Sequence, residues 1–404
     1  MRGGCRRTTE TPINIESRDG GLWIGDSLAA NFAIEDPRAL YSPSDFKRLE
    51  AIQVRVIPPI SEPSTVVLDI RQGSLANQIL QQLPECRIME KNAINRIDSY
   101  LLDGTKSSPP ADRQALYFRE QGLHHLSDGN WVSVCGDRLV GKCCGFGAAL
   151  HPSLKALHLA INENLSAKDA VVQQVQNMAR HQTNVLIAHG FTLLSALRSE
   201  IMRRGVVSTF PLLSVVGPQN YGKTELAIRQ CLLYDHQTSK KAAAKLNIIS
   251  SEKGLVASTS GFRDQVVLID DLGIGSHTCV EKKGLQVMSM ILRYGANDSE
   301  RHTATSSHTA CSQTCQVGIA FTGELPFTSA SDCRRIIQIR LTEPLRDGSP
   351  YDRTIAATAF YHWLEWFLGH ATEQFNLLDQ NLAEAGQVKQ ARLQNTYIMR
   401  FANG

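Results

Sequence analysis

The chain has 404 residues, of which 42% are hydrophobic and 20% charged, and its formal net charge is +3. This length and hydrophobic content predict a globular protein of two or three domains. The nearly balanced charge excludes a strong global field for nucleic acid or an anionic membrane, so any nucleic-acid site must be local.

The lack of an apolar targeting segment and the pattern of cysteines indicate the same compartment. No apolar run reaches the roughly 18 residues of a membrane span, and the basic N-terminus lacks the apolar segment of a signal peptide. The ten scattered cysteines are expected to be reduced thiols. We therefore expect a cytoplasmic protein with no membrane partner.

The first 165 residues are expected to form two N-terminal regions. Residues 1–110 contain short apolar segments such as STVVLDI, separated by the Pro-rich loop VIPPISEPS, and indicate an α+β region of unassigned role that ends in the linker LDGTKSSPPADRQ. Residues 111–165 are predicted to be rich in β-structure. There, two β-type runs flank Ser127–Asp128–Gly129–Asn130, and a glycine in such a turn accepts a positive φ, so we expect a β-hairpin.

Residues 166–345 are predicted to hold an α/β core with leading helices. The segment 166–204 has helical periodicity with an expected break near Gly190. Helical or polar segments then separate four apolar runs, an alternation typical of a parallel sheet. The runs lie at 212–216, 266–269, 317–321 and 336–339.

Two further segments are expected to be helical. Residues 346–404 indicate a C-terminal helical region, with one helix over 354–371 and another over about 373–400. The stretch SKKAAAKL, with Lys240, Lys241 and Lys245, has a short basic patch that is more typical of a solvated helix face than of a nucleic-acid site.

The stretch LLSVVGPQNYGKTELAIRQCLL, residues 212–233, interrupts an apolar run with the pattern G-x-x-x-x-G-K-[ST]. Glycines let the backbone fold tightly so that its N–H groups face phosphate oxygens. The lysine reaches the β- and γ-phosphates, the hydroxyl binds Mg²⁺, and the following helix presents its positive end. An ordinary turn between strand and helix is the alternative. We predict a site for ATP and Mg²⁺ formed by Gly217, Pro218, Gln219, Asn220, Tyr221, Gly222, Lys223, Thr224 and Glu225.

Two adjacent carboxylates end the apolar run in QVVLIDD. A P-loop ATPase needs a carboxylate at the end of a neighbouring strand to hold Mg²⁺, and a group that orients the attacking water. We assign Asp270 to Mg²⁺, together with Thr224, and Asp271 to water activation. A helix cap is the alternative for this acidic pair.

Thr322, Arg334 and Arg335 complete the predicted catalytic set with Lys223 and Asp271. Thr322 follows the third apolar run, where its hydroxyl could sense the γ-phosphate or help to place the water, or else cap a turn. Arg334 and Arg335 precede the fourth run. Guanidinium groups stabilise charge on the transferring phosphoryl group, and ring ATPases supply them from the adjacent subunit. A surface salt bridge is the alternative for this pair.

In this order, GPQNYGKT, VVLIDD, FTGE and DCRRI resemble the ATPase core of the bacterial "domain of unknown function 927" family. That family includes self-loading, MCM-like AAA+ helicases of staphylococcal cassette elements and is related to superfamily III viral helicases. GLHHLSDGNWVSVCGDRLVG is similar to the β-rich segment before its ATPase. MILRYGANDSER is similar to a helix and basic loop of the family, matched here by Gly295 and Arg301.

The resemblance covers roughly residues 115–342 and implies an AAA+-like P-loop core that forms a ring, expected to be a hexamer, on DNA. The chain departs from the family at Gln219–Asn220–Tyr221, where the family often has a Ser-Ser-rich loop. It also departs at Asp271, where the family often has glutamate.

Within the resemblance, GANDSERHTATSSHTACSQTC lies between a helix and the strand that begins at Val317. In AAA+ and superfamily III rings a hairpin at this position enters the pore and grips DNA, which implies phosphate contacts for Arg301, His302 and His308. A solvated Ser/Thr loop is the alternative. His308, Cys311 and Cys315 also have part of the spacing of a zinc site, without an obvious fourth ligand nearby.

Together these features predict an ATP-hydrolysing ring motor on DNA, namely a replicative helicase of a phage, plasmid or integrated element. A regulatory or assembly ATPase that unwinds nothing has the same core, and it differs in DNA-stimulated turnover and strand displacement. A small-molecule P-loop kinase fits less well, because the large N-terminal region and the Arg334–Arg335 pair favour an oligomeric ATPase.

Overall fold

The computed structural model of the chain describes residues 15–387 with internal gaps. The gaps are residues 91, 107–114, 144–146, 152–153, 155–156, 181–182, 237–238, 243–244, 248–258, 260–261, 273–290, 292, 297–300, 305–309, 314, 325–329 and 346–352. The chain divides into two compact units. Unit 1 comprises residues 1–119, 125–130 and 143–152, and unit 2 comprises residues 120–124, 131–142 and 153–404.

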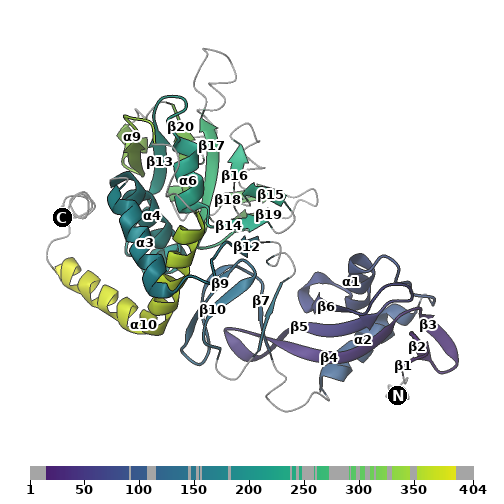
Figure 1. Ribbon diagram of the computed structural model, residues 1–404. Coiled ribbons are helices and arrows are strands. Elements are labelled where there is room, and N and C mark those ends of the chain that lie inside the picture. Colours follow the sequence, from purple (N-terminus) through teal and green to yellow (C-terminus); the bar gives the residue numbers. More distant parts are fainter. Residues whose placement is uncertain are drawn as a thin grey trace. The chain divides into compact units, whose positions relative to one another are not determined.

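Unit 1 is built on a five-stranded sheet with the strand order β11-β7-β4-β5-β6. Its two long strands, β4 and β5, lie side by side in Figure 1. Strands β4, β5 and β6 pair antiparallel, whereas β7 and β11 join in parallel. In β5, the alternate residues Ile52, Val54 and Val56 are fully buried, which is the period-two pattern of a strand with one covered face. Side chains of α1 and α2, including Ile79 and Ile97, belong to the same core.

The elements of unit 1 are β1 (Ile15–Arg18), β2 (Gly21–Ile24), β3 (Ser27–Ala30), β4 (Ala33–Ser42), β5 (Asp45–Ile57), β6 (Ser64–Asp69), η1 (Ile70–Gln72), α1 (Leu75–Gln82), α2 (Ala93–Lys106), β7 (Ala115–Phe118) and β11 (Gly147–Leu150). The first three strands form a separate antiparallel sheet. The Pro-rich stretch after β5 is a loop, as predicted.

Unit 2 contains the small sheets β10-β9-β8 and β12-β14-β15, a two-stranded hairpin, and a five-stranded parallel sheet. Its elements are β8 (Gly122–His125), β9 (Trp131–Cys135), β10 (Arg138–Gly141), β12 (Leu157–Leu159), α3 (Ala167–Arg180), α4 (Thr183–Ser195), α5 (Arg198–Arg203), β13 (Leu212–Val216), α6 (Lys223–Cys231), β14 (Tyr234–His236), β15 (Ser239–Ala242), β16 (Lys245–Asn247), β17 (Val266–Leu272), β18 (Arg301–Ala304), β19 (Ala310–Gln313), β20 (Gly318–Gly323), α9 (Ala330–Cys333), β21 (Ile336–Arg340) and α10 (Arg353–Gln387).

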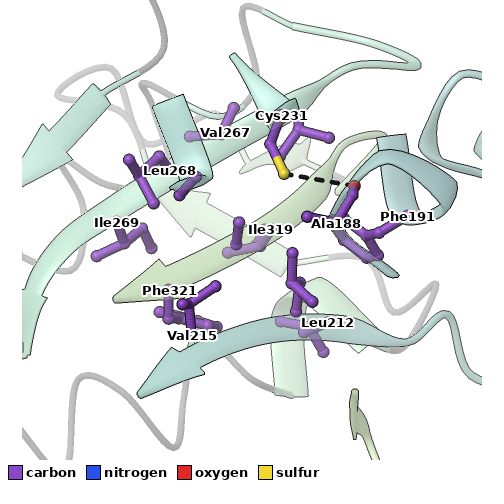
Figure 2. Close-up of a cluster of buried hydrophobic side chains, with 14 of the residues drawn as sticks. Ala188, Phe191, Leu212, Val215, Cys231, Val267, Leu268, Ile269, Ile319 and Phe321 are labelled. Atoms are coloured by element: carbon purple, nitrogen blue, oxygen red, sulfur yellow. Dashed lines mark hydrogen bonds between the residues drawn. The ribbon is translucent and has the colours of Figure 1, made fainter. Parts of the chain in front are cut away.

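The parallel sheet has the strand order β16-β17-β20-β13-β21. All five residues of β13 are buried, as expected for a strand inside a parallel sheet. Helix α6 packs against β13, β17 and β20, and α4 packs against α6. Figure 2 shows the shared core, with Phe191 of α4 near side chains of the strands and the Cys231 thiol donating to the carbonyl of Ala188 at 3.6 Å. The predicted α/β class with a parallel sheet is confirmed.

Several predicted elements match closely and others are wrong. All four apolar runs are strands of the parallel sheet, and the predicted β-hairpin joins β8 to β9 with a φ of 88° at Gly129. Gly190, however, lies inside α4 rather than at a break, because packing of α4 outweighs the roughly 1 kcal/mol cost of a helical glycine. Residues 239–242 and 245–247 form β15 and β16 instead of a helix, because pairing with β14 and β17 overrides the alanine-rich composition of this stretch.

The two predicted C-terminal helices are one. Helix α10 continues through Thr372, since no proline interrupts it and its buried side chains, such as Phe367 and Phe375, pack on one core cluster with β9. Residues beyond 387 lie outside the described part of the chain.

No helix among the described residues is long and apolar enough to cross a membrane. None of the six cysteines whose side chains are described forms a disulfide.

A buried carboxylate joins the small sheet β10-β9-β8 to the parallel sheet. Asp264, two residues before β17, is 3% exposed and has a φ of 52°. Its Oδ1 accepts a hydrogen bond from the N–H of Ser199 at 2.7 Å, and its Oδ2 accepts from the Ser199 hydroxyl at 2.6 Å and the N–H of Leu123 at 3.0 Å. Burial raises the pKa of Asp264, and the nearby guanidinium of Arg263 opposes this increase in part.

Candidate functional site

The loop between β13 and α6 holds the predicted phosphate-binding residues. Gly222 has a φ of 82° and precedes the first turn of α6, and Asn220 has a φ of 63°. The left-handed conformation is open to glycine and tolerated by asparagine. The side chains of Pro218, Gln219 and Asn220 are exposed, while Lys223 and Thr224 are partly buried. The ammonium of Lys223 donates to the carbonyl of Pro218 at 2.7 Å, so it lies over the loop itself.

Two hydroxyl groups donate to one carboxylate oxygen. The Thr224 hydroxyl donates to Oδ1 of Asp270 at 2.8 Å, and the Thr322 hydroxyl makes a short hydrogen bond to the same oxygen. Thr322 is 1% exposed, whereas Asp270 and Thr224 are partly exposed. Thr224 lies in the first turn of α6, Asp270 belongs to β17 and Thr322 to β20. Residues from three elements therefore meet where the parallel strands end, the edge at which such sheets bind ligands.

The strand order explains why Thr322 belongs to this cluster. We expected the strand that carries Asp270 to lie next to β13, the strand before the loop. Instead, β20 lies between β13 and β17. Val215 pairs with Thr322, so Thr322 lies on the strand between β13 and β17, and its hydroxyl reaches Asp270. The register shifts between Ile269 and Leu272, so Asp270 and Asp271 lie at an irregularity of β17, whose backbone continues two residues beyond Asp270.

Two other predicted site residues, Asp271 and Glu225, lie on elements of this cluster. The backbone of Asp271 belongs to β17, but its side chain lies outside the described residues. Glu225 is exposed and forms an ion pair with Arg229 one turn further along α6, so its carboxylate points along the helix surface.

Arg334 and Arg335 lie away from the loop of their own chain. They follow α9 and precede β21, and strands of a parallel sheet all begin at the edge opposite their carboxyl ends. The five residues of β21 span about 16 Å, which separates these arginines from the cluster around Asp270. Arg334 is exposed, and Arg335 donates to the carbonyl and hydroxyl of Ser331 at 2.6 and 2.8 Å.

The segment expected to contact DNA contains an antiparallel hairpin. Arg301 of β18 pairs with Gln313 of β19, and His302 pairs with Ser312. His308 falls outside the described residues. Cys315 is buried and its thiol donates to the carbonyl of Val317 at 3.5 Å. Within the described part of the chain, no group of three or more His, Cys, Asp or Glu residues could hold a metal.

One contact of the loop was missed at the sequence level. The side chain of Leu345, five residues after β21, lies against Gly222, and its N–H donates to the carbonyl of Tyr221 at 3.2 Å. The surrounding stretch LTEPL carries no motif, so no sequence signal indicated this contact.

Comparisons with known proteins bear on the fold. No protein-family profile matches the chain, and no curated protein matches it. Membership of the "domain of unknown function 927" family therefore stays a prediction. Two structures of JCV helicase share 15% identity over 54% and 56% of this chain and 69% of those chains, but their TM-score of 0.27 is too low to carry an argument.

A solved structure described as "SCCmec type IV Cch - active helicase" is similar over most of the chain. The TM-score is 0.55 and the sequence identity 12%, over 96% of this chain and 70% of that chain. At this identity the similarity concerns the fold alone. The chain therefore has a helicase-like fold.

Proposed function

We propose that the chain is an ATP-hydrolysing motor that forms a ring and acts on DNA. The observation that carries the proposal is the meeting of Thr224, Asp270 and Thr322 beside a loop with the P-loop pattern. The fold similarity to a structure described as an active helicase supports it. An ordinary turn between strand and helix would not require this convergence of polar groups at a ligand-binding edge.

The residues of the cluster suit a nucleotide with its metal. Hydroxyl and carboxylate oxygens are the ligands that Mg²⁺ prefers, and Thr224 and Asp270 present them side by side. Bound Mg²⁺ would neutralise charge on the β- and γ-phosphates. Lys223 would exchange the carbonyl of Pro218 for phosphate oxygens, and Asp271 would orient the attacking water.

The position of the tandem arginines supports a site shared between subunits. Arg334 and Arg335 lie about the length of β21 from the cluster in their own chain, so they are too distant to contact a phosphate there. In a ring they would instead contact the nucleotide of the adjacent subunit and stabilise charge on the transferring phosphoryl group.

ATP turnover with and without single-stranded DNA tests this function. We expect DNA to stimulate turnover several-fold and the chain to separate a forked duplex. Replacing Arg301 and His302 of β18 together by alanine should bring the ratio of stimulated to basal turnover towards one, because the hairpin loses two side chains expected to contact DNA phosphates.

The double variant Lys142→Ala/Lys168→Ala removes two exposed lysines elsewhere in unit 2 and serves as the control. Stimulation without strand displacement would favour a regulatory ATPase instead. Equal turnover with and without DNA would contradict a DNA motor.

The variant Thr322→Val should distinguish a catalytic role of the Thr322 hydroxyl from a purely structural capping role. Valine keeps a similar volume but cannot donate to Asp270, so we expect ATP turnover to fall about 10- to 100-fold while nucleotide binding changes little. Thr322→Ser retains the hydroxyl and should recover most of the turnover. Steady-state kinetics and a nucleotide-binding titration provide the two readouts. If the valine variant had the native rate of ATP turnover, the hydroxyl would have a capping role only.

A further inference from the structure

A short segment after β21 lies against the backbone of the P-loop. Val216, the last residue of β13, pairs with Arg340, and the N–H of Leu341 donates to the carbonyl of Val216 at 2.8 Å. The carbonyl of Leu341 then passes so close to Gly217 that a Cβ there would lie 2.8 Å from it. We call residues Leu341–Leu345 the strap.

The far end of the strap covers the second glycine of the loop. A Cβ on Gly222 would lie 2.9 Å from Cδ1 and 3.1 Å from Cβ of Leu345. The N–H of Leu345 also donates to the carbonyl of Tyr221, and both side chains pack against the same core cluster. Pro344 fixes its own φ and restricts Glu343 to extended conformations, so a stiff segment presents Leu345 to the loop.

The loop needs this support because its backbone is in a sparsely populated conformation. Asn220 and Gly222 are both left-handed, and such a conformation carries a cost for asparagine that persists only where surrounding structure determines it. The side chains of Gln219 and Asn220 are exposed and offer little packing of their own. Contacts of Tyr221 and Gly222 with Leu345 are therefore a principal constraint on the shape of the loop.

We propose that Leu345 is a positioning residue that holds the P-loop in the shape that receives phosphates. A loop freed from Leu345 samples more conformations, and binding a phosphate then requires ordering it again. The identity of the ligand as ATP rests on the proposed function, whereas the constraint on the loop is a property of the chain itself.

Hydrogen exchange of the full chain without nucleotide tests the constraint. In Leu345→Ala we expect the amides of residues 217 and 219–224 to exchange about tenfold faster, with little change in β4, β5 and β6 of unit 1. Leu345→Met should exchange at nearly the native rate. Leu378→Ala, which truncates another partly buried leucine that packs on a different cluster, is the matched control. Unchanged exchange at 217–224 in Leu345→Ala would overturn the proposal, and so would an equal increase throughout β13 and β20.

Titration with a fluorescent ATP analogue and steady-state kinetics provide the second measurement. We expect the Kd and the KM for ATP to rise about tenfold in Leu345→Ala, with a smaller change in kcat, and Leu345→Met to restore both. A purely structural defect would instead lower the active fraction without changing KM, which would overturn the positioning role. If the native chain neither bound nor hydrolysed ATP, the proposed function would fail, while the exchange measurement would still decide the role of Leu345.

Discussion

Replacing Lys223 by alanine is expected to reduce ATP turnover at least about 100-fold. The ammonium lies over the loop, on the carbonyl of Pro218, where it can reach a phosphate by a change of side-chain rotamer. A preorganised positive charge beside the transferring phosphoryl group stabilises the transition state, and loss of one such group typically costs two to three powers of ten in rate. Steady-state ATP hydrolysis by the purified chain measures the effect.

Two further variants make this result specific. Lys168→Ala removes an exposed lysine on α3 and should keep native turnover. Lys223→Arg retains the charge but presents a planar fork in place of a compact ammonium, so we expect it to remain strongly impaired. If Lys223→Ala hydrolysed ATP within tenfold of the native rate, the predicted phosphate-binding loop would not take part in ATP hydrolysis.

The parallel sheet could be predicted because its strands are short apolar runs with clear ends. LLSVV, VVLI and VGIAF each read as a buried strand, and polar residues follow each of them at the same edge of a parallel sheet. The meeting of Thr224 with Asp270 at this edge could therefore be predicted from where these runs end. The interposed position of β20 was not, since strand order depends on which strands pair and leaves no trace in the periodicity of any one strand.

Other features escaped prediction because long-range packing determines them. Lys245–Asn247 is a strand only through its pairing with β17, and a three-residue run has no periodicity to detect. Gly190 signalled a helix break that packing of α4 overrides. The contact of Leu345 with Gly222 joins residues far apart in sequence, and a half-buried leucine in a loop is not distinctive.

Replacing Asp264 by alanine is expected to lower the free energy of unfolding of unit 2 by about 3 kcal/mol. The substitution leaves the N–H of Leu123 and both donors of Ser199 without their acceptor, and an unsatisfied buried donor costs about 1–3 kcal/mol. Asparagine should not rescue the loss fully. Both carboxylate oxygens accept hydrogen bonds, and an amide nitrogen in place of one oxygen would face a donor.

The loss should be local and should depend on pH. Hydrogen exchange is expected to quicken in α5, β17 and β20 but not in β4–β6 of unit 1, and Asp26→Ala, in an exposed turn of unit 1, is the control. Because burial raises the pKa of Asp264 above its ordinary value of 3.8, the folded chain binds the proton more tightly than the unfolded chain. The native advantage over Asp264→Ala is therefore largest below pH 3.8 and decreases as the pH rises towards the folded-state pKa. Urea unfolding of both chains at several pH values above 4 measures this difference, and a native advantage that grew with pH would show that the pKa is lowered instead.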